Sequence, residues 1–270
     1  MKRKITILTI AFLSSMLMYA NAFAAATGRC GDSITWTLDD SGNLTLSGSG
    51  EMWNYGYVTS PFKDYGIKTV TIEYGITSIG DYVFRGCCGM TELTLPNSVT
   101  SIGDCAFYGC TGLTELILPN SVRSIGDIAF TYCSGLEKIT VESGNSCYDS
   151  RDNCNSIIDT EFNTLIVGCK NSVIPNSVTS IGYYAFYGCS GLTELTLPDS
   201  VASIGDGAFI CCSDLSKITS LAEIPPVCGS GVFDRVNKTN CELIVPIVSV
   251  TAYKQAEVWN EFSNIRAFPE

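Results

Sequence analysis

A spacing of 23 residues, repeated along the chain, limits its fold more than any other feature. Isoleucine recurs at this spacing at Ile79, Ile102 and Ile125, and again at Ile181 and Ile204. Fixed periods of about 20 to 50 residues are typical of solenoids, in which each repeat forms one coil. Because a single coil cannot bury its apolar side alone, neighbouring coils must stack. We therefore expect one elongated solenoid with a continuous core.

The unit from Leu113 onward shows how one coil is built. Leu116 and Leu118 alternate with Ile117, which predicts a short strand with two side chains directed inward. Pro119 ends this strand because proline has no N–H for a ladder. The return path is expected to direct five side chains inward, namely Val122, Ile125, Ala129, Phe130 and Cys133. Stacked coils then form parallel ladders of like residues.

Residues 1–24 have the pattern of a secretory signal peptide. Basic residues occupy positions 2 to 4, an apolar run spans 5–18, and small residues follow. We predict cleavage after Ala24, with Ala22 as the alternative. The apolar run is shorter than the roughly 20 residues of a membrane-spanning helix. The sequence therefore predicts a secreted or cell-surface protein, without membrane insertion once the signal is removed.

Acidic residues outnumber basic ones, which restricts the partners. The formal charge of the 270 residues is −11, and removal of Lys2, Arg3 and Lys4 changes it to −14. Such a surface repels nucleic acids and anionic lipids. We therefore expect no nucleic-acid partner.

Three regions are expected after the signal peptide. An N-terminal cap covers 25–66, with a hairpin whose strands flank the turn at 39–43. The repeats cover 67–222, and a C-terminal cap with a strand and a helix covers 223–270. One repeat, over 136–175, is longer than the others. Its polar section at 142–164 is expected to leave the solenoid as a loop, which in some solenoids is part of the binding face.

The fourteen cysteines fall into different settings. Five stand three residues after a phenylalanine and are expected to be buried free thiols of one ladder: Cys87, Cys110, Cys133, Cys189 and Cys212. Export nevertheless favours disulfides, and cysteines in irregular segments are the better candidates. The candidate pairs are Cys147 with Cys154, and Cys228 with Cys241.

The residues needed for much of enzyme catalysis are missing. The chain has no histidine, which removes Ser-His and Cys-His pairs and histidine metal ligands. Glu92, Glu115 and Glu194 are carboxylates that glycoside hydrolysis could use, but they occupy one repeated position. A catalytic pair needs two unlike environments to separate acid from base. We therefore predict a protein that is not an enzyme and that uses no cofactor and no metal.

The repeats resemble the BspA-like leucine-rich repeat. The resemblance rests on 101–116 (Ser-Ile-Gly-Asp-Cys-Ala-Phe-Tyr-Gly-Cys-Thr-Gly-Leu-Thr-Glu-Leu) and 195–201 (Leu-Thr-Leu-Pro-Asp-Ser-Val), and covers about 67–221. It implies a β-rich leucine-rich-repeat solenoid, an α/β-type horseshoe or arc with short parallel strands. It also implies a surface or secreted protein of host-associated bacteria. Some members of the family bind matrix proteins, plasma proteins or other bacteria. The resemblance implies no catalytic residues.

The predicted function is binding of other macromolecules at the repeat surface. We predict an adhesin-like protein that recognises host or bacterial extracellular proteins, with glycans as a second ligand class. A structural spacer at the cell surface is the alternative, and a glycan-acting enzyme is the least favoured. The candidate binding face consists of the outward residues of the expected strands: Thr69, Thr71, Glu92, Thr94, Glu115, Ile117, Lys138, Thr140, Glu194, Thr196, Lys217 and Thr219. The same residue types also suit strands that are merely soluble.

Overall fold

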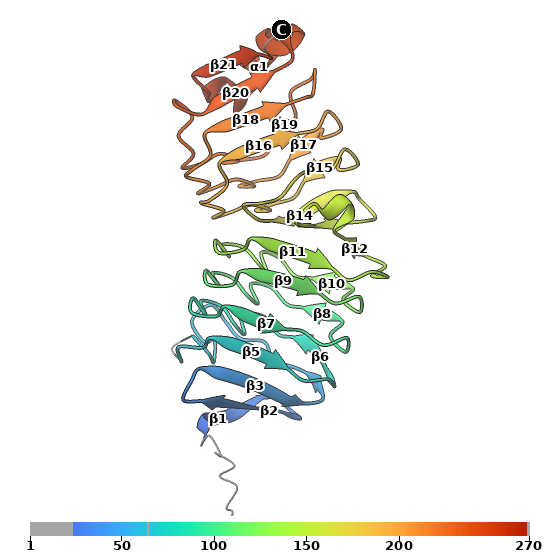
Figure 1. The fold of residues 1–270 in the computed structure, drawn as a ribbon, viewed down its shortest axis with the longest axis vertical. Helices are drawn as coiled ribbons and strands as arrows, with labels where there is room; N and C mark the ends of the chain where they lie inside the picture. Colours follow the sequence, from blue (N-terminus) through green and yellow to red (C-terminus); the bar gives the residue numbers. More distant parts are fainter. Residues whose placement is uncertain (1–23, 64, 269–270) are drawn as a thin grey trace, which may run out of the picture.

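The computed structural model describes residues 24–63 and 65–268, which form a solenoid of about ten coils (Figure 1). The coils stack along the long axis of the molecule, as the 23-residue spacing predicts. The predicted signal peptide lies outside the described residues except for Ala24, which begins the first strand. The solenoid expected from the sequence is therefore confirmed.

An antiparallel hairpin covers the N-terminal end of the stack. Strands β2 (Ile34–Asp39) and β3 (Asn43–Gly48) pair around the expected turn, and β1 (Ala24–Gly31) pairs with the other edge of β2. The Asp39 carboxylate accepts N–H bonds from Ser41 and Asn43, which closes the turn. Strand β3 then pairs in parallel with the first repeat strand, so the cap joins the solenoid through the sheet.

One wall of the solenoid, here called the strand wall, is built from the strands that the Leu-x-Leu pattern predicts. Its strands after β3 are β5 (Thr69–Ile72), β7 (Glu92–Thr94), β9 (Glu115–Leu118), β11 (Lys138–Val141), β16 (Glu194–Leu197), β18 (Lys217–Ser220), β20 (Glu242–Val245) and β21 (Asn264–Ala267). Paired strands are parallel and in register, so Lys138 lies beside Glu115 and Lys217 beside Glu194. Inward residues such as Leu116 are fully buried, whereas their neighbours face solvent.

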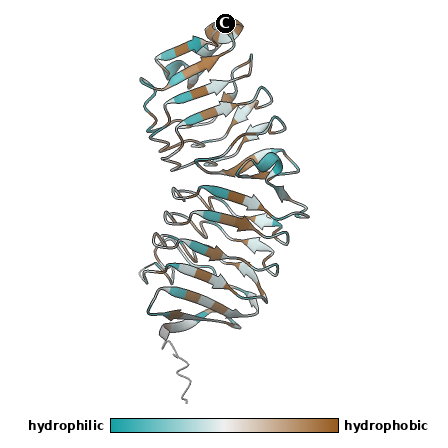
Figure 2. Ribbon diagram, viewed as in Figure 1, coloured by the Kyte–Doolittle hydropathy of each residue, from teal (hydrophilic) through white to brown (hydrophobic). Residues whose placement is uncertain are grey.

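A second wall of shorter strands runs along the return path. It consists of β4 (Gly50–Glu51), β6 (Ile76–Ile79), β8 (Ser101–Ile102), β10 (Ser124–Ile125), β14 (Thr164–Gly168), β15 (Ser180–Ile181), β17 (Ser203–Ile204) and β19 (Val227–Cys228). The isoleucines of the 23-residue spacing lie here, and Ile102 pairs with Ile79 and Ile125. The alternation of hydrophilic and hydrophobic residues is visible as bands along the strands of the strand wall (Figure 2).

The third side, here called the turn wall, consists of turns that carry the phenylalanine ladder. It comprises 81–87, 104–110, 127–133, 183–189, 206–212 and 230–236. Backbone bonds link these turns from coil to coil, for example from Phe84 N–H to Ala106 O at 2.8 Å. The rings of Phe84 and Phe107 stack at 5.2 Å, and the same stacking joins Phe107 to Phe130. The return path therefore contains turns, where an α/β-type horseshoe would have helices.

The C-terminal end is covered by the strand and helix that the sequence predicts, with two short 3₁₀ segments. These elements are η2 (Ile247–Ser249), α1 (Val250–Gln255) and η3 (Trp259–Glu261). The Tyr253 hydroxyl lies 2.6 Å from Ser220 Oγ, and Trp259 Nε1 donates to Pro226 O at 2.8 Å. Both aromatic rings are buried over the last coil. No helix among residues 24–63 and 65–268 is long and apolar enough to cross a membrane.

The longer repeat forms strands inside the stack, and the expectation of a surface loop at 142–164 is wrong. Strand β12 (Tyr148–Asp149), the 3₁₀ turn η1 (Arg151–Asn153) and strand β13 (Ser156–Asp159) follow β11, and β13 pairs antiparallel with β14. Ile157 and Ile158 are neighbours on β13, so their side chains point to opposite faces and enter two different cores. The β13–β14 hairpin is thus a layer between two halves of the solenoid.

The apolar interior is divided by this hairpin, contrary to the continuous core expected. The first core extends from Cys30 to Cys169, and the second extends from Cys154 to Phe262. One stack of rings ends at Phe130 and the next begins at Phe186. We call the junction between residues 127–133 and 183–189 the seam.

The cysteine ladder is buried, as expected. Cys110 Sγ and Cys133 Sγ lie 3.2 Å from the carbonyl oxygens of Phe84 and Phe107, and Cys212 Sγ makes the same contact with Phe186. Each thiol therefore adds a second hydrogen bond to a carbonyl one coil earlier that already accepts a backbone N–H. Burial raises the pKa of Cys212 to about 12, because the thiolate would lose its hydration.

Neither candidate disulfide is present, since every cysteine in the described part of the chain is a free thiol. Cys154 belongs to the second core, whereas Cys147 packs against the first. Cys228 lies on β19 of the second wall, and Cys241 directly precedes β20 of the strand wall. The two pairs are separated for different reasons, because Cys147 and Cys154 pack in different cores, whereas Cys228 and Cys241 lie on different walls around the second core.

Candidate functional site

The strand wall presents the twelve residues of the predicted binding face, and none of them is buried. Outward and inward side chains alternate, so that Ile117 is 47% exposed between two buried leucines. The structure brings together the members on paired strands, such as Thr69 with Glu92 and Thr71 with Thr94. It does not make one sheet of all twelve, because β11 and β16 belong to different sheets on either side of the seam.

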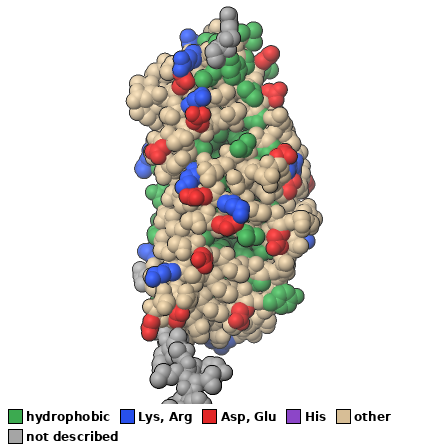
Figure 3. Space-filling model, viewed as in Figure 1, with side chains coloured by type: hydrophobic (Ala, Val, Ile, Leu, Met, Phe, Trp, Pro, Cys, Tyr) green, Lys and Arg blue, Asp and Glu red, His purple; other side chains and the backbone are tan. Residues whose placement is uncertain are grey.

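Charges on this wall are paired along the solenoid axis. Lys138 Nζ lies 2.6 Å from Glu115 Oε1, and Lys217 Nζ lies 3.4 Å from Glu194 Oε2. Figure 3 shows acidic and basic side chains side by side on the face drawn. Among the ion pairs of residues 24–63 and 65–268, Glu92 takes no part. The twelve outward positions are therefore hydroxyls, one exposed isoleucine and internally paired charges, with Glu92 as the unpaired carboxylate.

A row of aromatic side chains on the turn wall was not anticipated from the sequence. The Arg85 guanidinium carbon lies 3.5 Å from the centroid of the Tyr57 ring, and it also faces the Tyr108 ring at 5.6 Å. The row then continues from Tyr108 to Tyr132 at a centroid distance of 6.3 Å. Desolvation, and then the neighbouring Tyr187, raise the pKa of Tyr108 to about 12.

This tyrosine row crosses the seam. The centroids of Tyr132 and Tyr187 are 5.6 Å apart, and those of Tyr187 and Tyr184 are 5.4 Å apart. Tyr183 follows, with its ring centroid 4.0 Å from that of Tyr184 and half of its surface exposed. Tyrosine and arginine are enriched where proteins bind other proteins. The turn wall is thus a second surface with the composition of an interface.

Tyr132 carried a sequence signal that could have revealed this row. It stands two residues after the ladder phenylalanine, at the position that Gly109 and Gly188 hold in their repeats. All three residues have a positive φ, at 62° for Tyr132, 74° for Gly109 and 78° for Gly188. A left-handed backbone is unfavourable for a tyrosine by roughly 1 kcal/mol. Cys211 and Arg235 hold the same position in later coils, with φ of 60° and 64°, so the sequence signal for the row is the tyrosine itself and not the departure from glycine.

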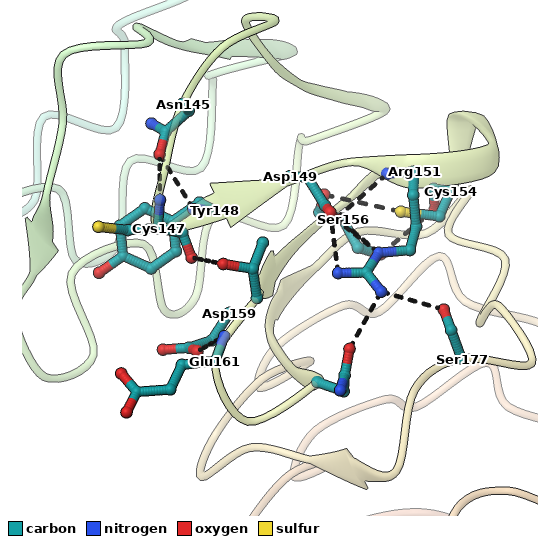
Figure 4. Close-up of polar contacts among 12 residues, drawn as sticks. Asn145, Cys147, Tyr148, Asp149, Arg151, Cys154, Ser156, Asp159, Glu161 and Ser177 are labelled. Carbon is teal, nitrogen blue, oxygen red and sulfur yellow. Dashed lines mark hydrogen bonds and ion pairs between the residues drawn. The ribbon is translucent and has the colours of Figure 1, made fainter.

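The polar residues of the longer repeat hold the two halves together (Figure 4). Arg151 binds Asp149 through Nε and Nη2, with its Nη2 at 2.8 Å from Asp149 Oδ2. Arg151 Nη1 donates to Asn163 Oδ1 at 3.0 Å and lies 3.4 Å from Ser177 Oγ. Asn145 Nδ2 reaches back to Val122 O in the preceding coil at 3.0 Å. Most of this polar segment is therefore occupied by bonds within the protein.

The part of the chain that the structure describes contains no candidate metal site. Within residues 24–63 and 65–268, no three His, Cys, Asp or Glu side chains gather as metal ligands would. Glu115 and Glu194, two of the three repeated carboxylates, lie on separate sheets and each pairs with a lysine.

Comparison with known proteins agrees with this architecture. A leucine rich cell surface protein from Faecalibacterium prausnitzii has a similar crystal structure, with a TM-score of 0.54 at 20% identity over 89% of this chain and 94% of that chain. A leucine-rich repeat protein from Eubacterium ventriosum gives a TM-score of 0.43 at 23% identity, covering 85% of this chain and 83% of that one. The pneumococcal vaccine antigen PcpA gives 0.39 at 14% identity, over 92% and 100% of the two chains. At these identities the first similarity shows the fold alone.

No curated protein matches the sequence. The family described as the BspA type leucine rich repeat region matches 59–166 and 155–244, in six copies. These matches cover more than half of the 270 residues, and they coincide with the stacked coils. The chain therefore belongs to the BspA-type leucine-rich-repeat family.

Proposed function

We propose that this protein is an adhesin-like binding protein of the cell surface or the extracellular space, and that it recognises host or bacterial proteins through its repeat surface. The observation that supports the proposal is the strand wall, where outward side chains of paired strands lie in register along one side of the solenoid. Extended faces of this kind are the binding surfaces of solenoid proteins. The similar structure from Faecalibacterium prausnitzii is described as that of a cell surface protein, which agrees with this location.

On the strand wall we assign the contact residues to the twelve outward positions of the predicted face. Threonine hydroxyls such as Thr71 and Thr94 offer hydrogen bonds, and Ile117 offers an exposed apolar contact. Glu92 offers an unpaired carboxylate for a basic group of a partner. Glu115 contributes less, because its charge is already balanced by Lys138.

A structural spacer is the second candidate, and the internal pairing of charges favours it. Lys138 neutralises Glu115 and Lys217 neutralises Glu194, so these charges of the strand wall need no partner protein to balance them. A spacer would show no saturable binding of its own.

A binding screen separates these functions. The chain without its predicted signal peptide is tested against immobilised matrix proteins, plasma proteins and glycans, beside a variant with Glu92→Ala, Glu115→Ala and Glu194→Ala. A matched variant with Glu161→Ala, Glu223→Ala and Glu257→Ala removes three exposed carboxylates outside the strand wall. Saturable binding that only the first variant weakens supports the proposed face. Binding that both variants retain moves the site to another surface, and no binding to any target favours the spacer.

A further inference from the structure

The turn wall splays open at the seam. In regular coils, three backbone bonds link successive turns, such as Phe107 N–H to Ala129 O at 2.9 Å. Across the seam one such bond remains, from Tyr132 N–H to Tyr187 O at 3.0 Å. Within the described part of the chain, Phe130 N–H donates no hydrogen bond, because Ala185 O accepts Gly168 N–H of β14 instead. The wall is therefore closed at Tyr132 and open toward residues 127 and 183.

A ladder of aspartates ends at the same place. Asp81 Oδ1 accepts the N–H of Asp104 at 2.9 Å, and Asp104 Oδ1 accepts the N–H of Asp127 at 2.8 Å. The next coil has Tyr183 at this position and lies across the seam. Among residues 24–63 and 65–268, no group donates a hydrogen bond or forms an ion pair with the Asp127 carboxylate. Asp127 is exposed and remains available to a ligand.

The opening leads into a cavity of about 170 Å³. Phe130, Val167 and Ala185 line its apolar interior, and Asp127 and Tyr183 also contribute to the lining. An apolar cavity of roughly 150 Å³ is large enough for a benzene ring. The cavity is thus large enough for one long side chain, and its polar lining offers an unpaired carboxylate beside an aromatic row.

We propose that this seam pocket binds the lysine or arginine side chain of a protein partner. The methylene stem packs against the apolar interior, and the cation meets the Asp127 carboxylate at the opening. The neighbouring tyrosine rings favour a cation over an anion. The net negative charge, −14 once the predicted signal peptide is removed, attracts basic segments to the surface. The free N–H of Phe130 can donate a hydrogen bond to a backbone carbonyl oxygen of the same segment.

This proposal rests on the proposed protein-binding function and names the chemistry of the partner. It differs from the strand-wall proposal, since the pocket lies on the turn wall. Its test uses short peptides, so it does not require the natural partner to be known.

The probes are blocked pentapeptides, Gly-Gly-Xaa-Gly-Gly, in which Xaa is lysine, arginine or norleucine. They are titrated into the isotope-labelled chain without its signal peptide, and amide chemical shifts are followed by NMR. We expect saturable shifts at Asp127, Ile128 and Tyr183 with a cationic peptide and none with norleucine. Equal shifts with norleucine, or no saturable shift with any peptide, would overturn the proposal.

Two variants define the site. Asp127→Asn is expected to weaken binding of the cationic peptide at least about tenfold, because it removes the carboxylate charge without changing the shape of the side chain. Asp81→Asn is the matched control, since it removes the same charge from the same ladder but lies outside the pocket. Val167→Phe, which fills the interior, is expected to abolish binding. Equal loss of affinity in Asp127→Asn and Asp81→Asn would indicate general charge attraction and reject the pocket.

The two proposals fail separately. Binding of a protein in the screen that Asp127→Asn does not weaken, together with no peptide shift, rejects the pocket and leaves the binding function standing. Saturable peptide shifts in a chain that binds no protein in the screen support the pocket and count against the proposed function.

Discussion

The thiol of Cys110 lies 3.2 Å from the carbonyl oxygen of Phe84, one coil earlier in the solenoid. The contact recurs at Cys133 and Cys212, but Cys189 at the seam reaches Gly168 O at 3.6 Å instead of a phenylalanine. Cysteine at this position therefore fills a small apolar space and also supplies a hydrogen for a buried acceptor. The exception at Cys189 locates the hairpin that divides the stack.

Thiol accessibility should follow this burial. One cysteine is exposed, three are half-buried and ten are buried in the folded chain. We expect a maleimide reagent to modify Cys88 first and no more than four thiols before unfolding. Mass spectrometry after unfolding without a reductant should then find all fourteen modified. A smaller final number would reveal disulfides, and peptide mapping would identify them.

Alkaline pH should weaken the fold in a defined range. Burial raises the pKa of Cys87 and of Cys212 to about 12, whereas an unfolded thiol ionises near about 8.5. Below pH 8.5 both states keep the proton. As pH rises toward 12 the unfolded state alone loses it, so the free energy of unfolding falls, by at most about 1.4 kcal/mol per pH unit for each such group.

Urea unfolding between pH 7 and 10.5 measures this effect. Cys212→Ala should be less stable than the parent at pH 7 but should lose stability less steeply above pH 8.5. Leu215→Ala removes a buried side chain of the same coil that does not titrate, so it should keep the slope of the parent. Identical slopes in all three proteins would show that Cys212 does not cause the decline.

The phenylalanine stack predicts unequal effects of equal substitutions. Phe107 is stacked on both sides, at 5.2 Å from Phe84 and 5.2 Å from Phe130. Phe107→Ala should lower the free energy of unfolding by about 3 to 5 kcal/mol. Phe130 borders the seam cavity, so Phe130→Ala should lower the free energy of unfolding by a smaller amount. Chemical denaturation of both variants tests the difference, and a larger loss at Phe130 would contradict the stacking argument.

Backbone exchange should distinguish the seam from regular coils. Phe107 N–H is bonded to Ala129 O, whereas Phe130 N–H donates no hydrogen bond within residues 24–63 and 65–268. We expect the amide of Phe130 to exchange with solvent deuterium faster than that of Phe107, because exchange at Phe107 requires the bond to open. Two-dimensional NMR of the labelled protein measures both rates in one sample. Equal protection would mean that the seam is closed in solution.

Ion pairs on the strand wall should contribute little to stability. Lys138 and Glu115 are both exposed at their ends, so solvent screens the pair. Glu115→Ala should change the free energy of unfolding by less than about 1 kcal/mol, with a smaller change at high salt. Thermal unfolding at two salt concentrations provides the measurement. A loss above that limit would show that the wall depends on its charges.

The regular coils could be predicted from the sequence because the same pattern of apolar residues recurs in every repeat. The alternation at Leu116 and Leu118, the proline that follows and the ladder at Phe107 and Cys110 all depend on local spacing. The pairing across layers could not be predicted in this way. The β13–β14 hairpin has Ile157 in one core and Ile158 in the other, and burial of both faces of a strand depends on packing of segments from both halves. The charge pairs of the strand wall follow from register, but they emerge only when Glu115 and Lys138 are placed on adjacent strands.

Each regular coil contacts its neighbours through the same ladders, so coils can be added or removed without changing the type of contact between neighbours. Deletion or duplication of one 23-residue coil on either side of the hairpin would shift the caps by one strand spacing, about 4.8 Å, and leave every surviving ladder intact. The hairpin itself has no such freedom, since each of its faces fits a different half. A variant of this chain made in that way would therefore change in reach by whole coils, while the distance between the seam and its nearest coils stays constant. In such a series of variants, the seam is the fixed reference point and the number of coils is the variable.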